Sequence, residues 1–385
     1  MDILVIYLSP FNGLSSSAKR MLGMTKGLVK NGNNVVLLTA GINNECNILD
    51  SAEYDFLKKV KIILTEEIDG GKGETIQNTK WKGKIFECLG KVYRLVKIYG
   101  HTEKVAKKIS INILPIRKFD CVVSVSDPKT SHIALKKLLE QGLRVGKIIE
   151  YWGDPLFGDI TLKSIYSKRT LLKREKAMLG LADSIVYTSP FTVEREKVIF
   201  PEYASRMYFV PTASVSENVV VDKNRENAVY TIGYYGAYHS AARNILPLYN
   251  AFLSEKTNKM HLNIIGDTDL NLESQNNVTI LPRGDIREYE AKSDLLVCIL
   301  NREGTQIPGK LYYCATTYKP VLVIVDGDEK EKMRRFLEGF ERFFLCENDT
   351  NDIAKKIQEI SEDKREWNPA EILQEENVAR KIIEG

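Results

Sequence analysis

The sequence is poor in the residues that build metal sites and disulfide frameworks. Its 385 residues include only six cysteines and four histidines, and no two cysteines have the C-x-x-C spacing of zinc and redox motifs. Cysteines spread singly along a chain, two of them inside apolar strand-like runs, are typical of reduced thiols in a cytosolic protein. The histidines are dispersed as well, so we expect no metal site.

Long hydrophobic runs are also missing. The N-terminal stretch MDILVIYLSPFNG has no basic leader, and its apolar run is too short for a signal peptide or a membrane span. We therefore expect a cytoplasmic protein without a transmembrane helix. With 43% hydrophobic and 28% charged residues, the composition is that of a globular protein. A single core rarely grows beyond ~250–300 residues, so the length predicts two domains.

Charge is distributed unevenly along the chain. The net charge is only +4, but residues 80–118 hold eleven Lys and Arg against two Glu, a net of +9 that leaves −5 for the rest. Within this segment, WKGKIFECLGKVYRLVKIYG (81–100) has apolar residues at helical spacing, flanked by lysine and arginine. A basic amphipathic helix of this kind suits an anionic membrane surface, although a helix packed on its own domain carries the same stripe. We expect no nucleic-acid partner.

Strand-like and helix-like segments alternate along the whole chain. Short apolar runs rich in β-branched residues predict strands at 3–8, 34–39, 60–65, 121–126, 147–152, 184–189, 230–235, 261–266, 278–281, 295–300 and 321–325. Helical patterns lie between most of them, for example at 16–32 and 131–142. This alternation predicts an α/β fold with parallel sheets that are covered by helices on both faces.

A polar, poorly patterned run at 212–228 predicts a domain boundary. We expect an N-terminal domain at 1–211 and a C-terminal domain at 212–370, with the helical pattern at 371–385 packing back on the first. Both halves open with a strand, a glycine-containing turn, an arginine and a helix, as ILVIYLSPFNGLSSSAKR and YTIGYYGAYHSAAR show. The sequence therefore predicts two Rossmann-like domains whose parallel sheets face each other across a ligand-binding cleft.

Two segments of the second half indicate an anionic ligand. In GYYGAYHSAAR (233–243), Gly236 would let a phosphate approach the backbone, and Arg243 could clamp its oxygens. In IPGKLYY (307–313), Lys310 lies at the start of a helix, where the dipole disfavours a cation unless an anion lies between them. Because ligands bind at the carboxyl ends of parallel strands, both segments should border one crevice. The alternatives are an ordinary glycine turn and a surface lysine lying over a neighbouring tyrosine.

The order of these motifs resembles that of the GT-B glycosyltransferases of family 4. The motifs of the second half are YYGAY (234–238), NIIGDTD (263–269), ILPRGDI (280–286), AKSDLLVCIL (291–300), IPGKLYY (307–313) and KPVLV (319–323), and those of the first half include NGNNVVLLTA (31–40), DCVVSVSDP (120–128) and ADSIVYTSPF (182–191). The resemblance covers nearly the whole chain. It implies transfer of a sugar from a nucleotide diphosphate donor, UDP- or GDP-linked, with retained anomeric configuration and without a metal or other cofactor.

The resemblance also implies a set of donor-binding residues. They are Gly236, Arg243, Arg283, Pro308, Gly309, Lys310 and Tyr313. Lys310, Arg243 and the backbone near Gly236 would stabilise the leaving diphosphate, and the base would lie near Arg283. One position departs from the family pattern. Where the family usually has the second glutamate of a Glu-x7-Glu motif, which binds the donor ribose, this chain has Tyr313, whose hydroxyl can hydrogen-bond but carries no charge.

The expected acceptor side lies at the strand ends of the first half. Its candidate residues are Gly13, Ser15, Ser16, Asp127 and Asp154. Asp154, in EYWGDPLFGD beside an aromatic residue, joins Lys310 and Arg243 as the candidate catalytic residues. It would bind an acceptor hydroxyl or stabilise positive charge on the sugar. An ordinary Asp-Pro turn explains Asp127 equally well, and a lone histidine such as His132 is more often structural.

Two Asp-x-Asp sequences suggest a different class of transferase. Those at 267–269 and 326–328 each follow a predicted strand, like the metal-binding pair of GT-A glycosyltransferases. Such enzymes are built around one nucleotide-binding domain, whereas this chain has two similar halves. We therefore expect a GT-B glycosyltransferase that acts on a saccharide, lipid-linked, in cell-surface polysaccharide synthesis. The alternatives are a nucleotide-sugar 2-epimerase and a non-catalytic sugar-nucleotide-binding subunit of a transferase complex.

Overall fold

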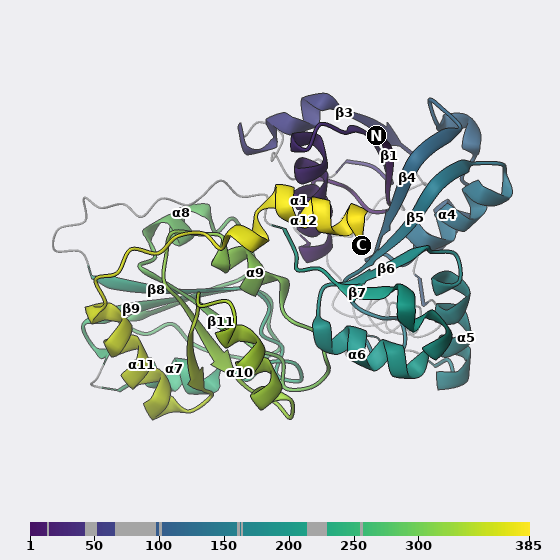
Figure 1. Cartoon of the computed structure of the whole chain (residues 1–385). Helices are drawn as coiled ribbons and strands as arrows, with labels where there is room; N and C mark the ends of the chain where they lie inside the picture. The colour runs from purple at the N-terminus through teal and green to yellow at the C-terminus, as the bar shows by residue number, and fades with distance from the viewer. Residues whose placement is uncertain are drawn as a thin grey trace, which may run out of the picture. The chain divides into compact units, whose positions relative to one another are not determined.

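The computed structural model of the chain divides into two compact units (Figure 1). Unit 1 comprises Met1–Val215 and Glu375–Gly385, and unit 2 comprises Ser216–Gln374. The structure describes residues 1–13, 15–42, 52–65, 98–99, 102–159, 162, 165–213, 229–254 and 257–385. Most of the amphipathic stretch at 81–100 and most of the polar run at 212–228 lie outside these residues, as do Cys46 and Cys88.

Unit 1 is built around a parallel sheet of seven strands in the order β3-β2-β1-β4-β5-β6-β7. The strands are β1 (Asp2–Tyr7), β2 (Asn34–Thr39), β3 (Val60–Leu64), β4 (Lys118–Val125), β5 (Arg144–Trp152), β6 (Ser184–Tyr187) and β7 (Met207–Phe209). The helical segments are α1 (Ser16–Lys30), η2 (Ala52–Lys59), α3 (Thr102–Lys108), η3 (Ile111–Ile113), α4 (Thr130–Glu140), α5 (Lys168–Leu179), α6 (Pro190–Ile199), η4 (Pro201–Arg206) and α12 (Glu375–Glu384).

Unit 2 repeats this plan with a parallel sheet of six strands in the order β10-β9-β8-β11-β12-β13. The strands are β8 (Tyr230–Tyr235), β9 (Met260–Ile265), β10 (Val278–Leu281), β11 (Leu295–Ile299), β12 (Val321–Val325) and β13 (Phe344–Glu347). The helical segments are α7 (Leu246–Phe252), α8 (Arg287–Lys292), α9 (Gly309–Ala315), α10 (Lys330–Glu338), α11 (Thr350–Glu362) and η6 (Glu371–Leu373).

The continuous apolar strands are explained by burial of both faces of the sheet. In β1, Ile3, Val5 and Tyr7 join a core with α1 and α12, whereas Leu4 and Ile6 join a second core with α3 and α4. A strand covered on both sides has no solvent face, so polar residues do not alternate with apolar ones. The predicted α/β class with parallel sheets is thereby confirmed.

All eleven predicted strands are present, but two further strands were missed. Both are short edge strands: β7 has three residues and β13 has four. In β13 only Cys346 is buried. An edge strand of this length carries no apolar run or alternation long enough to be distinguished from a loop.

Strand order places a candidate ligand-binding point in each unit. In both sheets the chain first steps outward in one direction and then crosses to the other side, so the order reverses between β1 and β4 and again between β8 and β11. Ligands of open parallel sheets bind outside the carboxyl ends of the strands at such a reversal. The loops after β1, β4, β8 and β11 are therefore the segments where function is expected.

The last helix belongs to unit 1, although unit 2 precedes it in the sequence. In Figure 1, α12 lies beside α1, and its Val378, Ala379 and Ile382 are fully buried in the same core. Lys30 of α1 pairs with Glu375 at 2.7 Å. Among the described residues, no helix is both long and apolar enough to cross a bilayer.

Candidate functional site

The two predicted segments of unit 2 meet at the reversal between β8 and β11. Lys310 is the second residue of α9, and its Nζ lies 5.6 Å from the ring centroid of Tyr235, the last residue of β8. Gly236 follows directly. The side of Gly236 where a Cβ would stand faces open space. The structure thus brings the Gly236 turn and Lys310 to one edge of the sheet, as the sequence predicted.

A buried carboxylate that the sequence did not reveal holds Lys310. Its Nζ donates to Glu290 Oε1 at 2.7 Å, and the Tyr313 hydroxyl donates to Glu290 Oε2 at 2.5 Å. The Glu290 side chain, from α8, is only 4% exposed. Burial alone would lower the pKa of Lys310, but attraction to Glu290 and to two neighbouring thiols raises this pKa above its usual value. The ammonium is therefore charged and fixed in place.

Arg243 braces the loop after β8. Its Nη1 donates to the Ala237 carbonyl at 2.6 Å, and its buried Nε has no hydrogen-bond partner within the described residues. The Gly236 amide is also committed, because it donates to the Ile265 carbonyl at 3.0 Å. A Cβ on Gly266 would overlap the Gly236 carbonyl, so two loops approach closely where glycine alone fits.

Carboxylates of both Asp-x-Asp sequences form hydrogen bonds or an ion pair with side chains or amides of other loops. Asp269 accepts from the amide and the hydroxyl of Ser240, both at 2.7 Å, while Asp267 pairs with Arg283 at 3.3 Å. In the second sequence, Asp326 accepts from Asn348 at 2.7 Å. Arg283 thus lies in the loop after β10, at the same strand ends as Gly236. Over the described ranges, no group of three or more metal-binding side chains comes together.

The strand ends of unit 1 carry a cluster of charged side chains. Asp127 follows β4, Lys129 precedes α4, and Asp154 and Asp159 lie in the loop after β5. Lys129 Nζ donates to Asp127 Oδ1 at 2.5 Å and to Asp159 Oδ2 at 3.3 Å. Burial, and then repulsion from Asp127, raise the pKa of Asp154 to about 6. The two aspartates predicted separately from the sequence belong to one cluster.

Two side chains from helices fix the loop that carries Asp154. Glu175 of α5 accepts from the amides of Leu156 and Phe157, at 3.0 Å and 2.6 Å. Arg20 of α1 donates to the Ser126 carbonyl, and its guanidinium fills the space where a Cβ on Gly153 would stand. Neither contact could be read from the sequence, because both partners lie on other elements far along the chain.

The remaining acceptor-side candidates lie at the start of α1 and in the turn before it. Ser15 is the N-cap of α1, and its hydroxyl accepts from the Ala18 amide at 3.1 Å. Ser16 is exposed in the first turn of α1, and Gly13 donates to the Pro10 carbonyl at 3.2 Å. These residues lie at the end of β1, and the recorded hydrogen bonds of Ser15 and Gly13 are with neighbouring residues of β1, the loop after it and α1.

His132 is a core residue. It is fully buried, stacks on Trp152 with ring centroids 4.3 Å apart, and shares a hydrogen bond of 2.7 Å with Ser124. Burial lowers its pKa to about 3, so the imidazole is neutral. The structural interpretation of this histidine therefore holds.

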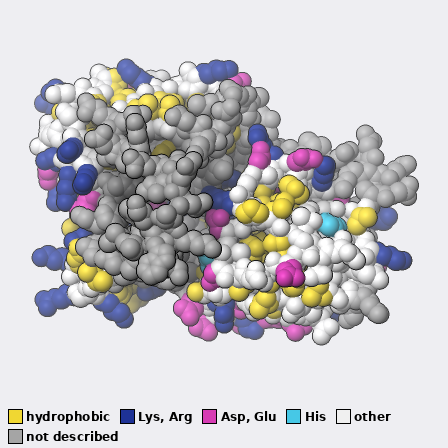
Figure 2. Space-filling view, turned by 180° about the vertical axis from the view of Figure 1, so that it is seen from behind, with side chains coloured by type: hydrophobic (Ala, Val, Ile, Leu, Met, Phe, Trp, Pro, Cys, Tyr) yellow, Lys and Arg dark blue, Asp and Glu magenta, His cyan; other side chains and the backbone are white. Residues whose placement is uncertain are grey.

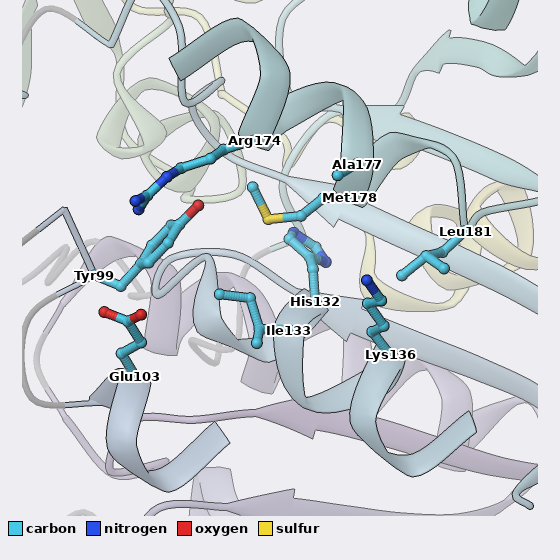
Figure 3. A pocket seen from close by; sticks show the side chains of 9 residues that line it. All are labelled: Tyr99, Glu103, His132, Ile133, Lys136, Arg174, Ala177, Met178 and Leu181. Atoms are coloured by element: carbon cyan, nitrogen blue, oxygen red, sulfur yellow. The ribbon is translucent and has the colours of Figure 1, made fainter. Parts of the chain in front are cut away.

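A pocket of about 240 Å³ opens beside His132 (Figure 3). The residues that line it are Tyr99, Glu103, His132, Ile133, Lys136, Arg174, Ala177, Met178 and Leu181. Arg174 Cζ lies 5.6 Å from the centroid of the Tyr99 ring, and in Figure 3 these two side chains stand together at one end of the pocket. The predicted site residues do not line this pocket, and the sequence did not indicate it.

Solved structures with the same fold confirm the predicted architecture. HepE of Anabaena, in complex with UDP-glucose, has a TM-score of 0.56 and 13% identity, with 100% of this chain and 96% of that chain covered. A sucrose-phosphate synthase from Thermosynechococcus elongatus has a TM-score of 0.54 and 15% identity over 100% and 94%. A glycosyltransferase from Rickettsia africae has a TM-score of 0.51 and 14% identity over 100% and 93%.

These likenesses concern the fold, which is that of the GT-B glycosyltransferases, as the motifs predicted. No protein-family model matches the chain, and no curated protein matches it in sequence.

The effect of a buried charge in unit 1 can be tested at Glu196. It lies in α6 and is fully buried, and neither carboxylate oxygen has a hydrogen-bond partner within the described residues. Burial, and then repulsion from Glu175, raise its pKa to about 9. The folded state therefore binds a proton that the unfolded state releases between pH 4.5 and pH 9, and stability falls as pH rises through this window.

We expect the substitution Glu196→Gln to reduce this loss of folding stability at high pH. Wild type and variant should be similarly stable near pH 5, and the variant should gain about 1 kcal/mol per pH unit above that. Urea unfolding at several pH values measures the difference. Glu194→Gln, an exposed position on the same helix, is the control. Parallel stability curves for wild type and Glu196→Gln would contradict the assignment.

Proposed function

We propose that the protein is a glycosyltransferase that moves a sugar from a nucleotide diphosphate donor to a hydroxyl of a saccharide. The observation that carries this proposal is the position of Lys310, a fixed cation at the β8–β11 reversal of a GT-B fold. HepE, which has this fold, is in complex with UDP-glucose. This neighbour supports a nucleotide sugar as the ligand, and we propose a UDP- or GDP-linked donor.

Unit 2 would bind the donor. An ammonium has three N–H groups, and Glu290 takes one of those of Lys310, so the others can donate to the diphosphate. Charge-assisted contacts of this kind stabilise the negative charge that develops on the leaving group. Arg243 would act through the loop that it braces, and Pro308 and Gly309 set the start of α9.

Three further residues have separate roles in donor binding in this proposal. The open side of Gly236 leaves room for a phosphate. Arg283, half exposed after β10, would lie near the base. Tyr313 donates its hydroxyl proton to Glu290, and in this proposal its oxygen would accept a hydrogen bond from the donor. We propose, by resemblance, that the anomeric configuration is retained.

Unit 1 would bind the acceptor at the Asp154 cluster. Asp127 and Asp159 are both held by Lys129, whereas no described residue donates a hydrogen bond to Asp154. A partly buried carboxylate without a donor favours a hydroxyl that can supply one. Its pKa of about 6 leaves Asp154 mostly ionised near neutrality, so it can also stabilise positive charge on the sugar.

The first test removes the proposed phosphate contact. Lys310→Ala should weaken binding of UDP or GDP by about 1.5–3 kcal/mol, the range of a charge-assisted hydrogen bond, as measured by titration calorimetry. Because the change strands buried Glu290, Lys310→Ala combined with Glu290→Gln should be measured as well. Lys355→Ala, an exposed position on α11, is the control. Unchanged affinity in the folded double variant would exclude Lys310 from the donor site.

The second test concerns metal. The carboxylates at 267 and 269 are engaged with Arg283 and Ser240, and Lys310 can supply the positive charge that a metal supplies in other transferases. We therefore expect release of nucleotide diphosphate from the sugar donor to proceed at the same rate in excess EDTA. Loss of this activity, with recovery on addition of Mn²⁺, would favour a metal site at Asp267 and Asp269 instead.

A lipid-linked acceptor, in polysaccharide synthesis at a membrane surface, is the finer part of the proposal. The described basic residues between Lys104 and Lys118 are all exposed. They are Lys104, Lys107, Lys108, Arg117 and Lys118. On the face seen in Figure 2, Lys and Arg side chains project along the outer edge of unit 1. Such a basic surface is attracted to anionic lipid.

The third test measures this attraction. Replacement of Lys104, Lys108 and Lys118 by glutamine should weaken binding to phosphatidylglycerol vesicles by about 1 kcal/mol per lysine that lies near the surface, and added salt should weaken it too. Co-sedimentation with anionic and neutral vesicles is the measurement. Replacement of Lys292, Lys332 and Lys355 in unit 2 is the control. If the protein sediments equally with both kinds of vesicle, the basic segment is only a solvated surface.

A further inference from the structure

We propose that Lys319 is a positioning residue of the candidate donor site, because its amino group fixes the end of the helix that carries Glu290. The sequence singled out Lys319 only as the first residue of the KPVLV motif. Its importance for the donor rests on the proposed function, but its effect on Glu290 and Lys310 can be measured without any nucleotide.

Lys319 is a lysine of the protein interior. It is only 1% exposed, although it lies in the loop between α9 and β12. Its Nζ donates to the Ala291 carbonyl at 2.8 Å and to the Ser293 carbonyl. Ala291 directly follows Glu290 in α8, and Ser293 is the C-cap of this helix. The side chain therefore joins the loop before β12 to the C-terminal end of α8.

The end of α8 depends on contacts from outside the helix. α8 has only six residues, and a helix this short is not stable without tertiary contacts. The last carbonyls of a helix also lack partners within it. In α8, the amide and the hydroxyl of Ser293 donate to the carbonyls of Glu290 and Tyr289, at 3.2 Å and 2.9 Å, and Lys319 donates to that of Ala291. A lysine side chain suits this end of the helix dipole.

Two contacts connect the end of α8 to the donor site. Glu290 accepts from Lys310 and from the Tyr313 hydroxyl. The Ser293 hydroxyl shares a hydrogen bond of 2.7 Å with the Tyr235 hydroxyl, and the centroid of the Tyr235 ring lies 5.6 Å from Lys310 Nζ. A shift of α8 would therefore move both the carboxylate that holds Lys310 and the ring beside it.

The loop that carries Lys319 is itself held in place. Arg342 is 4% exposed and donates to the carbonyls of Ala315, Thr317 and Lys319, at 3.2 Å, 2.6 Å and 2.7 Å. Ala315 is the last residue of α9, the helix that carries Lys310 near its start. Lys319 is thus fixed at its backbone as well as at its amino group, and it can hold α8 in a defined position relative to α9.

A purely structural role for Lys319 makes a different prediction. If the lysine only contributes to the stability of unit 2, its loss would affect the whole unit in proportion to the stability lost. If it positions Glu290, its loss would release Lys310 in a variant that stays folded. This release would require Glu290, because Lys319 acts on Lys310 through that carboxylate.

The experiment is acetylation of the protein with acetic anhydride, followed by mass spectrometry. The rate at Lys310 is measured relative to that at the exposed Lys355 of α11 in the same sample. Acetic anhydride reacts with the neutral amine, so the ion pair with Glu290 slows the reaction at Lys310.

We expect Lys319→Met, which keeps a similar length but cannot donate, to raise the relative rate at Lys310 about tenfold, the scale of one charge-assisted hydrogen bond. Lys319→Arg keeps the N–H donors, so the rate should return toward the wild-type value. An unchanged rate in folded Lys319→Met would overturn the proposal.

A double-mutant cycle tests whether Lys319 acts through Glu290. Glu290→Gln should itself raise the rate at Lys310, because it removes the ion pair. Lys319→Met should then add little in the Glu290→Gln background, since residues that act through one another are not additive. Equal effects of Lys319→Met with and without Glu290 would overturn the proposal.

Two further variants control for stability and folding. Thr257 is fully buried and donates to the Ala251 carbonyl of α7 at 2.7 Å, so Thr257→Val removes a contact at another helix of unit 2 and should leave the rate at Lys310 unchanged. If Lys319→Met does not fold, Lys319→Gln, with a shorter side chain and an uncharged donor, takes its place. A smaller rise is then expected, and an unchanged rate would overturn the proposal.

Nucleotide binding separates this inference from the proposed function. Lys319→Met should raise the Kd of UDP or GDP by about tenfold, whereas Thr257→Val should not change it. If the rate at Lys310 responds as expected but the wild type binds neither nucleotide, the positioning role stands and the proposed function fails. If the wild type binds nucleotide but the rate does not respond, the positioning role fails alone.

Discussion

Parallel pairing of the strands is the constraint on which every candidate site of this protein depends. Parallel strands all end at one edge of the sheet, so segments far apart in the sequence are brought together there. In unit 2 this edge joins the turn after β8, the loop after β10 and the start of α9. In unit 1 it joins the ends of β4 and β5. The candidate sites thus consist of common side chains that the parallel strand ends bring close together.

The two sheet edges have opposite arrangements of buried charge. In unit 2 one buried carboxylate, Glu290, holds a lysine and a tyrosine hydroxyl. In unit 1 one buried ammonium, Lys129, holds two carboxylates beside a third. A buried charge is costly unless it is paired, so separating the charged partners in either cluster would leave an unpaired buried charge. In the proposed function, the first arrangement would bind an anion such as a diphosphate, and the second would bind a neutral ligand that supplies hydroxyl groups.

The sequence predicted those features that depend on local pattern. β1 and β12 were evident because strands buried on both faces read as unbroken apolar runs, and Lys310 was evident because a cation at a helix start needs an explanation. Glu290 was missed because it lies in the short helix α8, twenty positions before Lys310, and no periodicity links the two. Lys129 looked like any charged residue after an Asp-Pro pair. Long-range side-chain pairing follows from the fold and not from neighbouring residues.

The return of α12 to α1 affects the order in which the molecule can be completed. Unit 1 contains residues from both sides of unit 2, and the Asn31 side chain bonds to the Glu376 carbonyl across 345 positions of sequence. Domains of a growing chain commonly fold one after another from the N-terminus. Unit 2 is thus an insertion within unit 1. The first unit to emerge would wait for its last helix until unit 2 had been synthesised, and the part of α1 that packs on α12 would stay uncovered meanwhile.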